Sequence, residues 1–186
     1  MPYRVDKIDP SKTAMIVVDM QNDFVAEGAA LRSAQAAAMV PKLAETLKFC
    51  REKGIRVVYT AHVHRRDGSD MGMYDDLYTP IADRSCLVDG TKGVEIFGDL
   101  APAPGEHVIK KHRYSGFFAT DLDLILREWG IKTVTHFGDD YRELLSRHCA
   151  PCDVQQLSSR LPVGRDRNVR LPRCGAGILV RRGSPP

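Results

Sequence analysis

Two short segments of strand-forming residues constrain the fold of this chain more than any other feature. Residues 13–18 read TAMIVV and end at Asp19, and residues 55–60 read IRVVYT. A continuous apolar run of this length is typical of a strand that is buried on both faces of a parallel sheet. Between the two segments, apolar residues recur at helical spacing from 40 to 50, and Gly54 follows where a helix is expected to end. The pattern predicts a strand, a helix and a second strand.

The chain after residue 60 alternates in the same way. Residues 62–104 are rich in Gly, Asp and Pro, and we expect loops there around one short helix. A strand is predicted at 107–110, a helix at 120–129 with Thr120 and Asp123 as a capping-box-like pair, and another strand from 131. Alternating strands and helices predict an α/β fold of three αβα layers, with a parallel, Rossmann-like sheet between helices.

The chain changes character after residue 135. All nine lysines precede this point, whereas the segment after it holds nine arginines and five acidic residues. Neither 161–167 nor 181–186 shows helical or strand periodicity. We therefore divide the chain into a folded domain, 1–135, and a weakly structured tail, 136–186, in which the C-terminal strands of the sheet are lost or degraded.

Composition argues against several classes of function. The arginines of the tail are scattered and accompanied only by Phe137 and Tyr141, so we expect no nucleic-acid partner. No apolar run reaches the roughly 18 residues of a membrane span, and the N-terminus lacks the apolar core of a signal peptide, so we expect no membrane partner. The expected location is the cytoplasm. Five cysteines, an odd number, do not predict a disulfide framework.

Two charged residues lie where strands are predicted to end. Asp19 follows the first strand, and Lys111 follows the strand at 107–110. Ligands of parallel α/β sheets bind at this edge, where a partly desolvated carboxylate is suited to act as a general base. A lysine there can stabilise a thiolate or an anionic intermediate. The alternatives are a turn cap for Asp19 and a solvated surface position for Lys111.

The segments around these two residues resemble the isochorismatase-like cysteine hydrolases, a family that includes nicotinamidases and carbamoyl-amide hydrolases. The first motif is Asp19-x-Gln21-x-Asp23-Phe24, which directly follows a strand, and the second runs from Lys111 to Phe117 as KHRYSGF. Both occur in the expected order, and the resemblance covers roughly residues 10–135. It implies hydrolysis of a small amide, carbamoyl or related carbonyl substrate without a cofactor, in a homo-oligomer.

The resemblance also implies roles for individual residues. The catalytic triad of the family is Asp, Lys and Cys, so Asp19 and Lys111 take the first two roles; Lys110 fits the motif less well. The residues expected to bind the substrate are Gln21, Phe24, His64 and Tyr114. Metal-binding members carry an Asp-x-His pair, but this chain has His62 and His64 in a His-x-His pair without a clear third ligand. We therefore expect histidines of the pocket rim or of a loop, and no metal.

The nucleophile that the resemblance implies is missing. The family places its cysteine after a segment of the form Gly-x-x-Thr-x-x-Cys, at a helix N-terminus where backbone N–H groups lower the thiol pKa and form an oxyanion hole. Here Gly138 is followed by DDYRELL, and the expected position holds Leu144. A leucine side chain cannot attack a carbonyl carbon.

A shift of reading frame accounts for this departure. When the chain from Gly138 is back-translated with permitted wobble bases and read one nucleotide later, it becomes GTTTENCCHATAR, the nucleophile motif followed by its helix. From Gln155 the same reading gives NNYRLVFLSDATGT, which fits a helix end, a strand and a loop. Our hypothesis is a frameshift near residues 135–136, which also explains the tail without lysine, because a GC-rich gene read out of frame yields Arg, Pro, Gly and Ser.

Two functions of other classes remain as alternatives. One is a non-catalytic pseudoenzyme that serves as a binding or oligomerisation module. The other is a redox or metal protein that uses Cys149 and Cys152, a CxxC pair. No second CxxC completes a zinc site, and His148 alone does not complete a ligand set.

Overall fold

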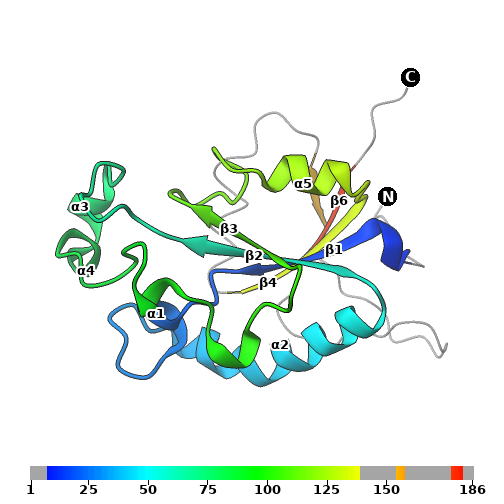
Figure 1. Cartoon of the computed structure of the whole chain (residues 1–186), viewed down its shortest axis with the longest axis horizontal. Coiled ribbons are helices and arrows are strands. Elements are labelled where there is room, and N and C mark those ends of the chain that lie inside the picture. Colours follow the sequence, from blue (N-terminus) through cyan, green and yellow to red (C-terminus); the bar gives the residue numbers. More distant parts are fainter. Residues whose placement is uncertain (1–7, 139–153, 158–176, 182–186) are drawn as a thin grey trace.

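A single sheet forms the centre of the computed structural model, which describes residues 8–138, 154–157 and 177–181. Its strand order is β3-β2-β1-β4-β6-β5 (Figure 1). The strands are β1 (Thr13–Val18), β2 (Arg56–His62), β3 (His107–Lys111), β4 (Thr133–Gly138), β5 (Val154–Leu157) and β6 (Gly177–Arg181). Strands β1 to β4 are parallel, whereas β6 pairs antiparallel with β4 and β5 antiparallel with β6.

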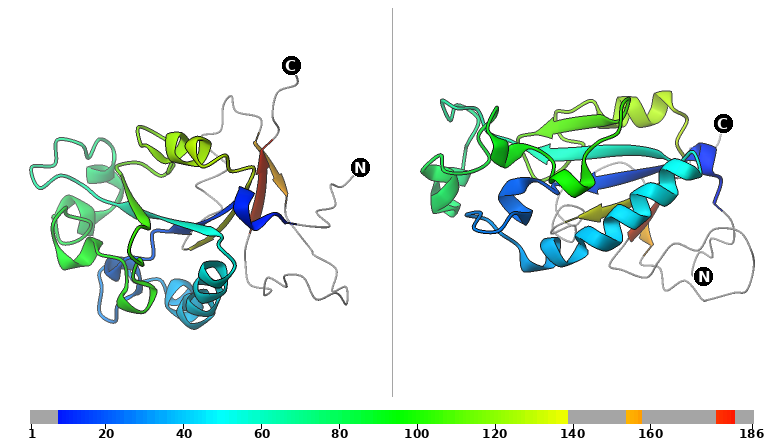
Figure 2. Two further views of the ribbon diagram at one scale, coloured as in Figure 1. Left: turned by 45° about the vertical axis from the view of Figure 1, so that its right-hand side comes forward. Right: turned by 60° about the horizontal axis from the view of Figure 1, so that its bottom comes forward.

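Helices cover both faces of the parallel sheet. The longest, α2, lies on one face and α5 on the other, as Figure 1 and the rotated views in Figure 2 show. The α-helices are α1 (Asn22–Val25), α2 (Ala34–Glu52), α3 (Tyr74–Leu77), α4 (Thr79–Ala82) and α5 (Leu122–Glu128), and the 3-10 turns are η1 (Pro10–Lys12), η2 (Lys92–Val94) and η3 (Gly98–Leu100). The predicted three-layer α/β fold is confirmed.

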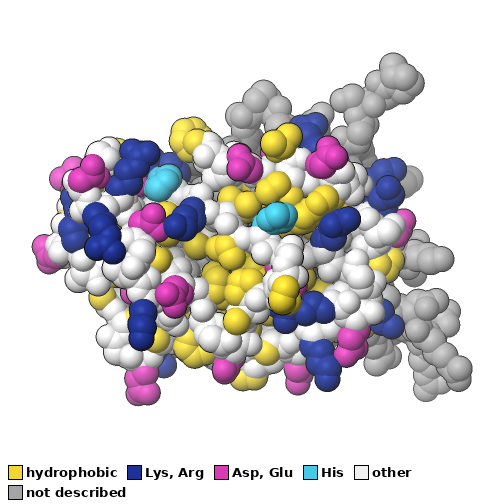
Figure 3. Space-filling view, viewed as in Figure 1, with side chains coloured by type: hydrophobic (Ala, Val, Ile, Leu, Met, Phe, Trp, Pro, Cys, Tyr) yellow, Lys and Arg dark blue, Asp and Glu magenta, His cyan; other side chains and the backbone are white. Residues whose placement is uncertain are grey.

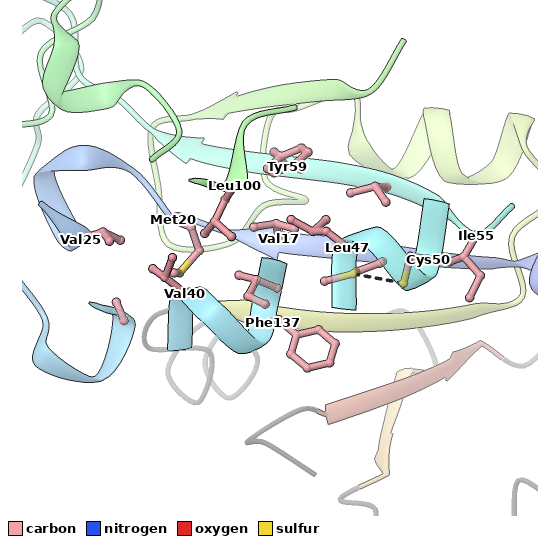
Figure 4. Packing of buried hydrophobic residues seen from close by; sticks show 14 residues of the cluster. Val17, Met20, Val25, Val40, Leu47, Cys50, Ile55, Tyr59, Leu100 and Phe137 are labelled. Carbon is pink, nitrogen blue, oxygen red and sulfur yellow. Dashed lines mark hydrogen bonds between the residues drawn. The ribbon is translucent and has the colours of Figure 1, made fainter. Parts of the chain in front are cut away.

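Side chains of β1 alternate between two hydrophobic clusters, as the pleat of a strand requires. Met15 and Val17 face α2, where they pack with Leu47 (Figure 4). Ala14 and Ile16 face the opposite side and belong to the cluster that includes residues of α5. All six residues of β1 are buried. The expectation of a strand buried on both faces is therefore confirmed.

Helix α2 begins earlier than its apolar periodicity indicated. Ser33 is its N-cap, and the Ser33 hydroxyl accepts a hydrogen bond from the N–H of Ala36 at 3.2 Å. The helix continues through Pro41 and ends at Glu52, shortly before Gly54, whose φ is +70°. Its first two turns contain mostly alanine, which favours helix formation but carries little periodic signal.

The structure differs from the sequence predictions in three further places. Two short α-helices and two 3-10 turns, rather than one helix, occupy residues 62–104. The N-cap of α5 is Asp121, so the predicted capping pair is wrong; the hydroxyl of Thr120 instead accepts a bond from the N–H of Leu122 at 3.3 Å. Where we expected lost or degraded strands, the tail contributes the short antiparallel strands β5 and β6.

Among the described residues, no helix has both the length and the apolarity to cross a membrane. On the face shown in Figure 3, acidic and basic side chains are interspersed around exposed hydrophobic ones. This face therefore presents no continuous basic stripe of the kind that tracks a nucleic-acid backbone.

Candidate active site

Asp19 lies at the carboxyl end of β1 in a conformation that few residues adopt. Its φ is +52°, and it is only 7% exposed. Its N–H donates to the carbonyl oxygen of Thr60 at 3.1 Å, and its Oδ1 accepts from the Thr60 hydroxyl at 2.8 Å. A left-handed backbone at a residue with a side chain costs about 1–3 kcal/mol and persists only where surrounding contacts hold it. These bonds from β2 hold the carboxylate in place.

Lys111 is the last residue of β3, and its ammonium group meets the carboxylate of Asp19. The distance from Lys111 Nζ to Asp19 Oδ2 is 2.6 Å, and the lysine side chain is 1% exposed. The ammonium also donates to the carbonyl oxygen of Tyr114 at 2.8 Å. The two predicted catalytic side chains thus meet at one edge of the sheet, although their catalytic roles stay a prediction.

The hydrogen bonds around the Asp19–Lys111 ion pair determine which chemistry the pair can support. Both oxygens of Asp19 have a partner, and additional hydrogen bonds of this kind are what a buried ion pair needs in order to persist away from water. A carboxylate in such a site can accept a proton, and an ammonium can stabilise a developing negative charge. The arrangement is therefore suited to acid–base chemistry.

Gln21 and Phe24 occupy structural positions beside Asp19. The amide of Gln21 is fully buried; its Nε2 donates to the carbonyl oxygens of His62 at 2.9 Å and Val94 at 3.0 Å, and its Oε1 accepts from the N–H of His62 at 2.8 Å. Both protons of the amide are thereby used. Phe24 packs between two hydrophobic clusters. The contacts brace the loops around the site, and the predicted contact of Gln21 and Phe24 with substrate stays untested.

Four rings form a contiguous group at the same edge of the sheet. The rings of His62 and His64 have centroids 4.9 Å apart, and Tyr74 lies 5.3 Å and 5.0 Å from them. Tyr114 lies 5.4 Å from Tyr74. Since the carbonyl oxygen of Tyr114 accepts a hydrogen bond from Lys111, the ring group adjoins the ion pair. His64 and Tyr114, both predicted to bind substrate, are thus brought together with the charged pair.

Asp70 connects the loop after β2 with the end of β3. Its Oδ2 lies 3.3 Å from Nδ1 of His64 and 2.7 Å from Nδ1 of His112, and its Oδ1 accepts from the N–H of Arg65 at 2.8 Å. Burial works against ionisation, but the bonds from Arg65 and His64 hold the pKa of Asp70 below its usual value. The carboxylate is therefore ionised at neutral pH.

Both histidines of the ring group favour the neutral state. Burial lowers the pKa of His62 well below its ordinary value, and the charge of Lys111 lowers it further. Burial also lowers the pKa of His64, and this outweighs the attraction of Asp70. Nε2 of each ring is buried and has no hydrogen-bond partner among the described residues.

The part of the chain that the structure describes shows no metal site around His62 and His64. Among residues 8–138, no group of three or more His, Cys, Asp or Glu side chains has an arrangement that could hold a metal ion. The oxygens of Asp70 already accept from the ring of His64, from His112 and from a backbone N–H.

The chain leaves β4 beside the site. Gly138 pairs with Val18 in the parallel register, one residue before Asp19. A Cβ atom at Gly138 would collide with the carbonyl oxygen of Val18, so this close approach requires glycine. Leu144, Cys149 and Cys152 lie outside the described residues. The position predicted for the nucleophile follows six residues after this glycine in the sequence.

Sequence reasoning missed Thr60, Tyr74 and Asp70. A signal existed for Thr60, because it lies opposite Val18 in the register of β1 and β2 and so carries a hydroxyl to the same edge as Asp19. Tyr74 and Asp70 lie in the segment between β2 and β3, where only tertiary contacts bring them to the site.

Comparison with known proteins identifies related sequences and structures. Residues 13–138 match the family described as "Isochorismatase domain". The ureidoacrylate amidohydrolase RutB of Rhizobium rhizogenes is 32% identical over 157 residues, which cover 74% of this chain and 64% of that protein. A probable inactive nicotinamidase of Arabidopsis thaliana is 31% identical over 127 residues, which cover 68% of this chain and 65% of that protein. The match thus spans slightly less than two thirds of each relative.

A solved structure shows the same architecture. The cysteine hydrolase from Pseudomonas syringae pv. phaseolicola 1448A superimposes with a TM-score of 0.64 and 37% sequence identity, over 68% of this chain and 59% of that one.

Proposed function

The chain belongs to the isochorismatase domain family, and on that premise we propose that it has the scaffold of a cysteine hydrolase for a small amide or carbamoyl substrate. One observation carries the proposal: the buried ion pair of Asp19 and Lys111, 2.6 Å apart, at the carboxyl edge of a parallel sheet. The relative from Rhizobium rhizogenes is named as an amidohydrolase, which supports a substrate with a C–N bond.

The proposed reaction assigns one task to each of three groups. Asp19 accepts the proton of a cysteine thiol, and the thiolate attacks the carbonyl carbon of the substrate. Lys111 and backbone N–H groups stabilise the negative charge of the tetrahedral intermediate. The C–N bond then breaks as Asp19 returns the proton to the leaving nitrogen, and water, deprotonated by the same carboxylate, releases the acid and the free thiol.

We infer that the thiol was lost through a shift of reading frame. The match to the family ends at residue 138, the same position from which the shifted reading restores the nucleophile motif with a cysteine in place of Leu144. Sequencing of the gene around codon 135, with identification of C-terminal peptides by mass spectrometry, tests this inference. The written tail encoded by verified DNA would show a genuine mutation, whereas shifted peptides would show an error in the sequence.

The polypeptide as written is expected to have no hydrolase activity, since it keeps the base and the lysine but lacks the nucleophile. The test is ammonia release from a panel of small amides and carbamoyl compounds, with protein whose intact mass matches the sequence. Turnover that disappears in the Asp19→Asn variant would contradict the assigned loss of the nucleophile.

A pseudoenzyme is a second candidate function. The Asp19–Lys111 pair is intact in the chain as written, and the relative from Arabidopsis thaliana is itself named as probably inactive. Saturable binding of an amide without turnover, abolished by Asp19→Asn, would favour this function. A chain that binds none of the panel would exclude it.

A further inference from the structure

The proposed reaction leaves Asp23, the second carboxylate of the motif that begins at Asp19, without a task. Asp23 lies in the first turn of α1 and is buried. Its Oδ2 accepts a hydrogen bond from the N–H of Leu87 at 2.7 Å, across 64 positions of the sequence. A buried carboxylate that accepts a hydrogen bond from a backbone N–H holds that part of the backbone in place.

Leu87 connects Asp23 to the ring group. The carbonyl oxygen of Leu87 accepts a hydrogen bond from the N–H of His64 at 2.7 Å, and the His64 carbonyl accepts from the N–H of Asp89 at 2.9 Å. His64 and Val88 also pair as a parallel bridge. The backbone of Leu87 is left-handed, with φ at +54°. Such a backbone persists only where contacts hold it, and the bond to Asp23 is one of these contacts.

The carboxylate of Asp23 also touches the other end of the same segment. It lies so close to Gly93 that a Cβ atom there would collide with both carboxylate oxygens. Gly93 is the middle residue of η2, and the next residue, Val94, accepts a hydrogen bond on its carbonyl oxygen from Nε2 of Gln21 at 3.0 Å. Asp23 thus contacts segment 87–94 at both of its ends, of which one is bonded to the ring group and the other to Gln21.

We propose that Asp23 is a positioning residue of the active site: its carboxylate fixes segment 87–94, which in turn holds the backbone of His64, and with it the ring group, beside the Asp19–Lys111 pair. This assignment rests on the proposed function, because it treats the ring group as part of that site. Asp23 binds an N–H group, so its acceptor oxygen matters and its charge does not. An amide oxygen can take its place, whereas an apolar side chain of the same shape leaves a buried N–H without a partner.

The test compares the chain as written with four single variants. Asp23→Leu keeps the branched shape of the side chain and removes both acceptor oxygens, whereas Asp23→Asn keeps one of them. Gly93→Ala displaces the carboxylate from the opposite side, because the new Cβ atom takes the space of its oxygens. Gly98→Ala is the matched control, since a Cβ atom there meets nothing within 4 Å beyond its chain neighbours. Neither glycine has a left-handed φ, so neither alanine strains the backbone.

Two measurements on ¹⁵N-labelled protein report the proposed connection: hydrogen exchange of the backbone amides and long-range ¹H–¹⁵N spectra of the histidine rings. In Asp23→Leu and Gly93→Ala we expect the amides of Leu87 and His64 to exchange about tenfold faster relative to that of Val58 in β2, the effect of losing one hydrogen bond. The ring signals of His64 should shift in the same two variants. The asparagine variant and the alanine control should keep the rates and ring signals of the parent.

A merely structural role gives a different result. Asp23→Leu would then speed exchange equally at Leu87, His64 and Val58 and leave the ring signals of the parent, and this outcome would overturn the proposal. An Asp23→Asn protein that behaves like Asp23→Leu would overturn it as well, because the charge would then be what matters. If Asp23→Leu does not fold, Gly93→Ala decides by the same criteria. None of these readouts needs turnover, so the proposed hydrolase function is tested separately, by ammonia release from the chain with its frame restored.

Discussion

The carboxylate of Asp19 and the ammonium of Lys111 lie 2.6 Å apart although they end two strands, β1 and β3, that are not neighbours in the sheet. Strand β2 lies between them and supplies the Thr60 hydroxyl that holds the other oxygen of Asp19. Side chains at the carboxyl ends of three parallel strands thus form or contact one buried charge pair.

Lys111→Met should destabilise the protein strongly. The substitution keeps an unbranched apolar stem but removes the ammonium group. The carboxylate of Asp19 is then buried without its counter-charge, which costs about 3–5 kcal/mol of unfolding free energy. Urea denaturation at pH 7 measures the effect. Lys42→Met is the matched control, because Lys42 pairs with Glu45 at 2.7 Å on the exposed face of α2 and its loss should leave the midpoint nearly unchanged. Equal midpoints for both variants would contradict the account.

Gln21→Ala should act on stability, because the glutamine amide makes three hydrogen bonds to the buried backbone of His62 and Val94. We expect a loss of about 3 kcal/mol or more from the backbone groups left without partners. Asn22→Ala is the control, since Asn22 donates a single exposed bond to the carbonyl of Lys92. An equally stable Gln21→Ala protein that fails to bind propionamide would instead assign Gln21 to the substrate.

Leu47→Ala should create a cavity between α2 and the sheet. The leucine is 1% exposed within the larger hydrophobic cluster, and a substitution of this kind costs about 2–5 kcal/mol. Leu124→Ala on α5 is the control, because Leu124 is 68% exposed. Thermal and urea unfolding measure both variants. A Leu47→Ala protein that loses no more stability than the Leu124→Ala protein would contradict the packing described for α2.

Acid should destabilise the protein through its buried histidines. Burial lowers the pKa of His62, His64 and His136 in the folded state, so the unfolded chain, with histidine pKa values near 6.5, takes up protons first. Stability is therefore full above pH 6.5 and decreases as the pH falls from there through the folded pKa values. Urea midpoints at pH 7.5, 6.5 and 5.5 measure the slope.

His62→Phe should flatten this dependence, because phenylalanine fills the same ring site and does not titrate. His107→Phe, at an exposed ring, should leave the slope as it is. A His62→Phe protein with the slope of the parent would exclude His62 as a source of the acid sensitivity.

Strand identity and the meeting of Asp19 with Lys111 could be predicted because both follow from local pattern. Apolar runs mark β1 and β2. A residue that ends or directly follows a parallel strand, such as Lys111 in β3, lies at the carboxyl edge. The same logic failed between β2 and β3. Asp70 and Tyr74 reach the site only because the loop folds back onto β2 and β3, through bonds such as that from Asp70 to His112, and no periodicity records such contacts.

The role of Gln21 was also beyond sequence reasoning. Its place in the motif beside Asp19 suggested contact with substrate, which stays a prediction; the structure shows that its amide bonds to two backbone carbonyls and one backbone N–H. The partners of Gln21 come from β2 and from η2, and only the folded structure brings them to the same place.

Ammonia release by the chain with its reading frame restored from residue 138 tests the central claim most directly. We expect turnover of about 1 s⁻¹ or more on at least one small amide or carbamoyl compound, none by the chain as written, and none by the restored chain with Asp19→Asn. A folded, restored chain without turnover on the panel, or with turnover unaffected by Asp19→Asn, would contradict the claim.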